Sequence, residues 1–269
     1  TIVGRKTFMS RVQVLASVMH QPDDSILEKL NIQSDAIIIN QCDRNRIEKR
    51  NYHGKKILWM DCAERGVGLS RNTAFMRADA DICIFADDDE QFEEGYENMV
   101  ISAFEQNKDA DILLFYVPSE NPERKNPEIR EEKRVHIYNC LRYGTFNIAV
   151  RTEAVRKKNI HFTLLFGGGT RYGSGEDSLF LAECLKAGLK IYTCPKLLAY
   201  SKQEESTWFQ GYTEKFFVDK GVLYQAISDK YGYWLCLQYV LRHKTEFEGI
   251  SIRQAMTWMN QGRKEWKKK

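Results

Sequence analysis

The sequence lacks the residue spacings that typify zinc proteins and membrane-spanning proteins. Its five histidines are isolated, and no two cysteines form a Cys-x-x-Cys pair, which argues against a zinc site. An odd number of unpaired cysteines is typical of reduced thiols in a cytosolic protein. No apolar run reaches 18 residues, so no transmembrane helix is expected, and no secretory signal is visible. We therefore expect a cytoplasmic protein. The seven cysteines are scattered, at positions 42, 62, 83, 140, 184, 194 and 236.

The composition is that of a soluble globular protein, with 43% apolar and 29% charged residues in 269. This length allows one large domain or two modest ones. The net charge of +3 is uneven, because the stretch from Arg242 onward holds eight Lys or Arg against three Glu. The C-terminus is therefore the basic part of the molecule.

Apolar residues recur at helical spacing inside this basic tail, at positions 252, 255, 256 and 259. Basic residues surround them, at positions 253, 263, 264 and 267–269. Such a helix can lie on an anionic membrane surface, here the inner face of the membrane. The alternative is a helix packed on the main domain, followed by a solvated lysine tail.

Apolar runs of strand length alternate with helical patterns through the first half of the chain. This alternation predicts an α/β fold, with a mostly parallel central sheet flanked by helices. Strands are expected at 12–19, 36–40, 56–61, 81–86 and 111–117. Helices are expected at 25–30, 68–78 and 95–107.

The second half of the chain opens with a break in this rhythm at 118–134, which holds three prolines and many charges. We expect a mobile surface loop there, because the segment has little apolar area to bury. A strand and helix follow at 146–160, then a helix at 177–188 and a strand at 190–195. The last forty residues have a helical pattern.

The stretch "IFADDDEQFEEG" (84–95) places Asp87, Asp88 and Asp89 directly after an apolar strand. Ligands of open parallel α/β sheets bind outside the carboxyl ends of the strands. A divalent cation such as Mg²⁺ or Mn²⁺ would offset the repulsion between these carboxylates, and a diphosphate would complete its ligands. The alternative is a solvated acidic turn that ends the strand.

Two further motifs carry charge next to glycines. In "GGGTRYGSGED", Glu176 and Asp177 stand at the expected start of a helix. Carboxylates are common there for a structural reason alone, because they complement the helix dipole. In "ERGVGLSRN", Arg65 and Arg71 flank a helix start at Ser70 that can meet an anionic phosphate. Arginines at helix starts are also commonly just exposed.

Taken in order, "GLSRNTAF", "ADADICIFADDDE" and "GSGEDSLFLAECLKAGLKIYTCP" resemble family 2 glycosyltransferases of the GT-A fold, over about residues 10 to 200. The resemblance implies a GT-A domain over 1–225, with a nucleotide-sugar half at 10–118 and an acceptor half at 119–225. Residues 226–269 would form a helical extension with the basic tail.

The resemblance also implies roles for individual residues. Asp89 would bind Mn²⁺ or Mg²⁺ together with Asp87, and Asp87 would also lie near the ribose or base. Asp177 would be the base that deprotonates the acceptor hydroxyl. The nucleotide-sugar site would further hold Asn40, Gln41, Arg71, Asp88 and Glu176.

Two positions depart from the family pattern. The family more often has Asp where Asn40 and Gln41 stand, and "KLLAYSKQEESTW" lacks the His that helps many relatives to hold the metal. The Gln-x-x-Arg-Trp motif of processive synthases is absent. The expected activity is inverting transfer of a single sugar from a UDP- or GDP-sugar to a glycan or lipid-linked acceptor hydroxyl, in surface polysaccharide or glycoconjugate assembly. No nucleic acid partner is expected.

Two other activities stay open on the sequence alone. "GGGTRYG" (167–173) is similar to the glycine-rich signature of sugar nucleotidyltransferases, although there it follows the first strand. A nucleotide-binding module without catalysis is the other alternative. The aromatic stretch 206–226 is either core or an acceptor platform; we expect Phe216 and Phe217 in the core and leave Trp208 open.

Overall fold

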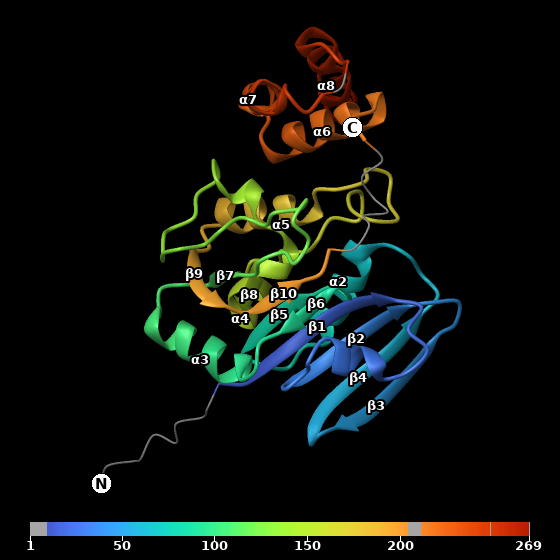
Figure 1. Cartoon of the computed structure of the whole chain (residues 1–269), viewed down its shortest axis with the longest axis vertical. Coiled ribbons are helices and arrows are strands. Elements are labelled where there is room, and N and C mark those ends of the chain that lie inside the picture. Colours follow the sequence, from blue (N-terminus) through green and yellow to red (C-terminus); the bar gives the residue numbers. More distant parts are fainter. Residues whose placement is uncertain (1–9, 204–210, 248, 269) are drawn as a thin grey trace.

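The computed structural model describes residues 10–203, 211–247 and 249–268. Its centre is an eight-stranded sheet in the order β3-β4-β2-β1-β5-β8-β7-β9, with a separate two-stranded pair, β10-β6 (Figure 1). The neighbours from β4 through β2 and β1 to β5 run parallel, as do β7 and β9, whereas β3 and β8 are antiparallel to their neighbours. The strands are β1 (Val12–Met19), β2 (Asp35–Gln41), β3 (Arg46–Tyr52), β4 (Lys55–Cys62), β5 (Ile82–Ala86), β6 (Glu90–Phe92), β7 (Ile112–Tyr116), β8 (Ile148–Arg151), β9 (Ile191–Leu197) and β10 (Ala199–Ser201).

Helices cover both faces of the sheet, which confirms the α/β prediction. One face packs against α1 and α3, through side chains such as Leu27 and Phe104. The other packs against α2, α4 and α5, through side chains such as Phe75 and Phe180. The described helices of the main domain are α1 (Ser25–Lys29), α2 (Val67–Arg77), α3 (Tyr96–Gln106), α4 (Thr152–Lys157) and α5 (Glu176–Lys186), with short 3-10 turns at Cys140–Arg142 and Thr145–Asn147.

Strand β3, an antiparallel edge strand, was not expected from the sequence. Its sequence, RIEKRNY, is mostly charged and exposed, because an edge strand needs to bury little. The expected loop at 118–134 has no helix or strand. It is nevertheless anchored, since Ile129 is buried and the Asn126 side chain donates to the Val117 carbonyl at 2.9 Å. All seven cysteines are free.

Three C-terminal helices, α6 (Glu214–Ile227), α7 (Gly232–His243) and α8 (Ile252–Lys267), form a bundle at one end of the molecule (Figure 1). The helical part therefore begins at Glu214, before the expected boundary at 225. Phe217 is fully buried and Phe216 partly so, as expected, whereas Trp208 lies outside the described residues.

Most of the apolar face of α8 packs on α6. Ala255 and Met259 are completely buried, and Gly221 of α6 lies directly against the Met259 backbone. Ala255, Met256 and Met259 are therefore packed inside the helical bundle, whereas Ile252 is 39% exposed. Contact of the basic tail with a membrane stays a prediction. Within the described part of the chain, every helix is too short or too polar to cross a bilayer.

Candidate active site

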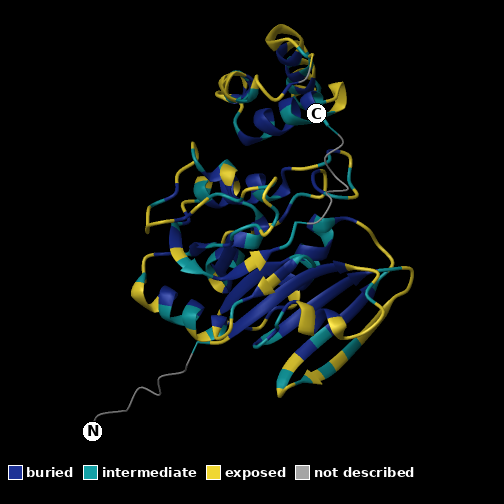
Figure 2. Cartoon of the chain, in the orientation of Figure 1, coloured by how far each residue is buried: buried dark blue, intermediate teal, exposed yellow. Residues whose placement is uncertain are grey.

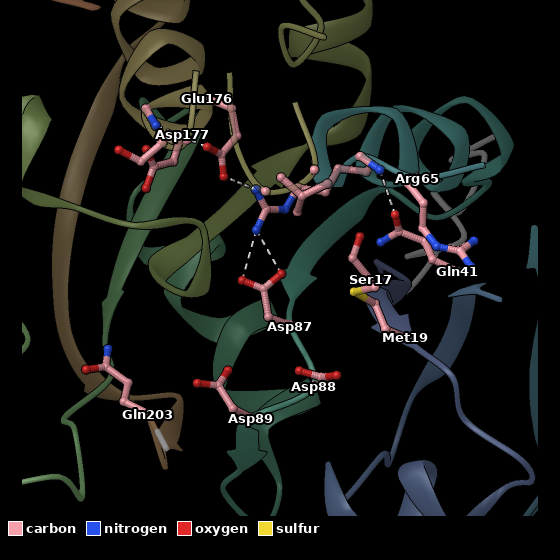
Figure 3. A pocket seen from close by; sticks show the side chains of 18 of the residues that line it. Ser17, Met19, Gln41, Arg65, Asp87, Asp88, Asp89, Glu176, Asp177 and Gln203 are labelled. Atoms are coloured by element: carbon pink, nitrogen blue, oxygen red, sulfur yellow. Dashed lines mark hydrogen bonds and ion pairs between the residues drawn. The ribbon is translucent and has the colours of Figure 1, made fainter. Parts of the chain in front are cut away.

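A cavity of about 770 Å³ opens at the carboxyl ends of the parallel strands. Its floor is made by the ends of β1 and β2 and by the turn after β5, and its other walls come from the start of α2, the glycine-rich segment before α5, and residues 202–203 (Figure 3). The three motifs singled out in the sequence thus line one cavity, although they are distant in the chain.

The Asp87–Asp89 turn joins β5 to β6 and lines this cavity. Burial, together with the neighbouring carboxylates, raises the pKa of Asp88 and of Asp89. Glu90 adds a fourth carboxyl and is 2% exposed; among the residues that the structure describes, neither of its oxygens has a hydrogen-bond partner. The backbone N–H of Lys202 donates to the Asp89 carbonyl at 2.8 Å and fixes the turn. The turn therefore crowds four carboxyl groups together, and burial and this crowding raise the pKa of three of them.

Arg71 lies in α2 beneath the cavity, only 3% exposed. One terminal nitrogen, Nη2, donates to both oxygens of Asp87 at 2.8 and 2.9 Å. The other, Nη1, donates to Glu176 Oε1 at 2.7 Å (Figure 3). Burial opposes its charge, but the two carboxylates outweigh burial and raise the pKa of Arg71. Arg71 was expected to meet a phosphate; here its terminal nitrogens join the two acidic motifs.

Glu176 and Asp177 begin α5, as the sequence predicted. Burial, and then the charge of Glu176, raise the pKa of Asp177 to about 6. The approach to this helix requires glycine: Gly175 has φ +116°, and a Cβ on Gly167 would lie 2.8 Å from Glu176 Oε2. The glycines therefore let the backbone pass close to the Glu176 carboxylate.

Gln41 and Asn40 end β2 but face different surroundings. Gln41 lines the cavity, and its Oε1 accepts from the Gly66 backbone N–H at 2.8 Å. Asn40 is completely buried, and its amide nitrogen donates to Asp61 Oδ1 at 2.8 Å and to the Gln21 carbonyl. Asn40 therefore connects β2 to β4, and Gln41 is the residue of the two that lines the cavity. Contact with a nucleobase stays a prediction.

Several cations around the cavity were missed by the sequence analysis. Lys29, Arg124 and Lys202 line it. Burial lowers the pKa of Lys220 in α6. The charges of nearby Asp177 and Glu176 act in the opposite direction but are outweighed. None of these residues belongs to a motif, and each reaches the site only through tertiary packing.

The acidic turn has the right ligand chemistry for a hard divalent cation. Among the described residues, no three His, Cys, Asp or Glu side chains converge into a complete metal site. Mg²⁺ is commonly held by one or two carboxylates, with substrate phosphates and water completing the octahedron. Asp88 and Asp89 line the cavity and fit a cation of that kind, which would be held chiefly through Asp89.

Residues 33–164 match glycosyl transferase family 2. Residues 1–349 of S. aureus TarS in complex with UDP-GlcNAc are similar in structure, with a TM-score of 0.60 and 16% identity over 87% of this chain and 73% of that one. The same TarS fragment with UDP gives 0.59 and 16%, over 87% and 72%. TarS itself gives 0.59 and 15%, over 87% of this chain and 43% of that one. No curated protein sequence matches.

Residues 33–164 of the chain belong to glycosyl transferase family 2, and the central domain has the GT-A fold. The matched residues include Gln41, Arg71 and the Asp87–Asp89 turn, and they end before Glu176 and Asp177. The roles of those last two residues therefore rest on the geometry of the cavity.

Proposed function

We propose that the protein transfers a single sugar, with inversion, from a nucleotide-diphospho-sugar to an acceptor hydroxyl. The observation that carries the proposal is the cavity itself, in which Arg71 connects the acidic turn after β5 to the carboxylates that begin α5. The TarS fragment binds UDP-GlcNAc and UDP, which favours a UDP-sugar as donor over a GDP-sugar.

On the donor side, Gln41 faces the nucleobase, and Asp87 and Asp88 lie along the ribose and diphosphate. Asp89, assisted by Asp87, would hold Mg²⁺ or Mn²⁺. Such an ion neutralises charge that develops on a departing diphosphate, so no general acid is needed. Lys202 and Arg124, which line the same cavity, can bring further positive charge to the diphosphate.

On the acceptor side, Asp177 accepts the proton of the attacking hydroxyl. A general base must lie within hydrogen-bond reach of that hydroxyl, and its pKa is best placed near the working pH. A value of about 6 meets the second condition. Glu176 is held by Arg71 and serves to orient the start of α5.

The acceptor is expected to be a glycan or lipid-linked hydroxyl, in surface polysaccharide or glycoconjugate assembly. The free thiols of the seven cysteines suit a cytoplasmic setting. In that setting nucleotide-sugars would reach the cavity directly.

Thermal unfolding with a panel of UDP- and GDP-sugars, with and without Mn²⁺, tests the donor and the metal together. A ligand that binds only the folded protein raises the melting temperature. A UDP-sugar is expected to raise the melting temperature only when Mn²⁺ is present. Asp89→Ala is expected to abolish this increase. Glu153→Ala, an exposed acid of α4, is the matched control.

The reaction product separates this proposal from the nucleotidyltransferase alternative. A glycosyltransferase releases a nucleoside diphosphate from a nucleotide-sugar, whereas a nucleotidyltransferase releases pyrophosphate from a nucleoside triphosphate. Release of pyrophosphate would contradict the proposal. So would a finding that, in Mn²⁺, Asp89→Ala binds the donor as tightly as the wild type does.

A further inference from the structure

The glycine-rich segment, residues 166–175, leads into α5 and forms one wall of the cavity. Its two arms are joined by backbone hydrogen bonds: the Gly167 N–H donates to the Tyr172 carbonyl at 2.9 Å, and the Tyr172 N–H donates to the Leu165 carbonyl at 3.1 Å. It lines the cavity at positions 168, 169, 173, 174 and 175. Glycine leaves a backbone many conformations and offers no side chain for packing. Contacts with other parts of the chain must therefore hold this segment in place.

Helix α8 supplies one such contact through Glu265. The Tyr172 hydroxyl donates to Glu265 Oε1 at 2.8 Å, and Arg171 Nη2 donates to the same oxygen at 2.7 Å. Burial, and then the carboxylate, raise the pKa of Tyr172 to about 12, so its hydroxyl remains a donor at neutral pH. A single oxygen of α8 thus binds two consecutive side chains of the glycine-rich segment.

Trp266, the next residue of α8, contacts the other arm of the segment. The ring centre of Phe166 lies 5.9 Å from that of Trp266, with an angle of 62° between the two planes, and 4.8 Å from that of Tyr172. Aromatic rings at such separations attract one another when they are tilted or edge-on. Phe166 is fully buried, so water is excluded from this contact. Glu265 and Trp266 together therefore fix both arms of the segment to α8.

Helix α6 fixes the end of the segment that is nearest to the proposed base. Asp219 Oδ2 accepts from the Gly173 N–H at 3.2 Å, and a Cβ on Gly175 would lie 2.6 Å from Leu223 Cδ1. Beyond its first two residues, every position of α6 is buried or half-buried (Figure 2). The C-terminal bundle therefore holds the backbone directly before α5, the helix that begins with Glu176 and Asp177.

We propose that Glu265 is a positioning residue for sugar transfer, because it holds the glycine-rich segment, and with it the start of α5, in the geometry that places Asp177 beside the acceptor hydroxyl. The bundle formed by α6, α7 and α8 is then part of the acceptor side of the cavity. The side chain of Glu265 is 33% exposed, so its removal leaves the core of the bundle intact and loosens the segment locally. The effect on the rate rests on the proposed transfer, whereas the hold on the segment does not.

Hydrogen–deuterium exchange of the 269-residue chain, followed by mass spectrometry, measures the hold on the segment directly. In Glu265→Ala the peptides that cover 166–175 should exchange about tenfold faster or more, because local opening frees their amide hydrogens, while peptides of β1 and β5 exchange as in the wild type. Glu265→Gln keeps an oxygen to which the Tyr172 hydroxyl can donate, and it should restore slow exchange. Gln261→Ala, at an exposed position of the same helix, is the control and should exchange like the wild type.

Steady-state kinetics separate positioning from donor binding. Misplacing a reacting group by about 1 Å can cost about 10²-fold in rate. Glu265→Ala should therefore lower kcat by about ten- to hundredfold and leave the KM for the donor within about twofold of the wild type. Tyr172→Phe removes the hydroxyl of the same contact and should also lower kcat. The double variant Tyr172→Phe/Glu265→Ala should be no slower than Glu265→Ala, because both changes remove one contact.

Unchanged exchange of residues 166–175 in Glu265→Ala would overturn the proposal. So would a kcat equal to that of the wild type in spite of faster exchange. A rise in the KM for the donor that accounts for the whole loss of kcat/KM would also overturn it, because Glu265 would then act on donor binding. A wild type that transfers no sugar would contradict the proposed function together with the positioning role, whereas equal transfer by the wild type and Glu265→Ala would contradict the positioning role alone.

Discussion

Arg71 and Glu176 lie 105 residues apart in the sequence and form a buried ion pair, with Nη1 donating to Oε1 at 2.7 Å. The same guanidinium holds both oxygens of Asp87 through Nη2. One side chain of α2 therefore fixes the turn after β5 relative to the start of α5. Donor and acceptor sides of the proposed reaction are connected by a single cation.

Replacing Arg71 with methionine is expected to destabilise the protein by about 3–5 kcal/mol, because it leaves two carboxylates without their buried partner. Arg71→Lys should recover part of this loss, since a lysine cannot span both carboxylates with a planar fork. Urea unfolding measures the change. Arg77→Met, at an exposed position of the same helix, should stay within about 0.5 kcal/mol of the wild type. Equal stability of Arg71→Met and Arg77→Met would show that the ion pairs of Arg71 make no net contribution to the free energy of unfolding.

Two glycines allow α6 and α8 to pack closely. A Cβ on Gly221 would lie 2.0 Å from the Met259 carbonyl oxygen, and one on Gly262 would lie 2.0 Å from that of Val218. Either glycine replaced by alanine should force the helices apart and cost about 1–3 kcal/mol. Gly173→Ala, where the added methyl group meets nothing within 4 Å, is the control in thermal unfolding. If all three variants melt alike, the close approach of the two helices is not what holds the bundle together.

The sequence predicted those parts of the fold and site that depend on local pattern. A buried strand followed by Asp87–Asp89, and a glycine-rich stretch followed by Glu176, both lie where alternating strands and helices indicated. Asn40 has the same kind of position, yet its role depends on Asp61 of β4, which no local pattern reveals. Lys220 reaches the site from α6 through tertiary packing alone. Strand β3 was not predicted because it is polar and exposed, so it lacks the apolar run by which the other strands were recognised. Its pairing with β4, a tertiary contact, is what makes it a strand.

The Asp177→Asn variant keeps the shape of the side chain and removes its ability to accept a proton. General-base assistance is worth about 10²–10⁴-fold in rate, so sugar transfer should fall by that factor. Donor affinity, measured by calorimetry, should stay close to that of the wild type. In the wild type, kcat/KM should fall as the pH drops below about 6, because the protonated carboxyl cannot act as a base. Near-normal transfer by the Asn variant would assign the base to another group.

The same variant should also change how stability depends on pH. Folding raises the pKa of Asp177 from 3.8 to about 6, so the folded state binds this proton more tightly than the unfolded state. The resulting stability is fully present below the unfolded pKa and is lost as the pH rises through about 6. Asp177→Asn removes this loss and should be more stable than the wild type at about pH 7.5. Urea midpoints between about pH 5 and 8 measure it; a difference between the two proteins that does not change over this range would contradict the raised pKa.

Lys220 gives the last prediction, because it is the cation that α6 brings to the acceptor side of the cavity. Its Nζ lies 5.7 Å from the ring centre of Phe216 and 5.9 Å from that of Tyr239, and its charge lowers the pKa of Asp177. Lys220→Met keeps the length of the side chain and removes the charge, so the pKa of Asp177 should rise. The acid limb of the kcat/KM profile should then move to higher pH, with activity largely recovered at about pH 8, where the carboxylate is ionised again.

The control for Lys220 is Lys215→Met, in which a lysine of the same helix that pairs with Asp219 is removed. That variant should leave the pH profile unchanged. A purely structural role for Lys220 would lower activity by the same factor at every pH, with the acid limb where the wild type has it. That outcome would show that the charge of Lys220 does not act on Asp177.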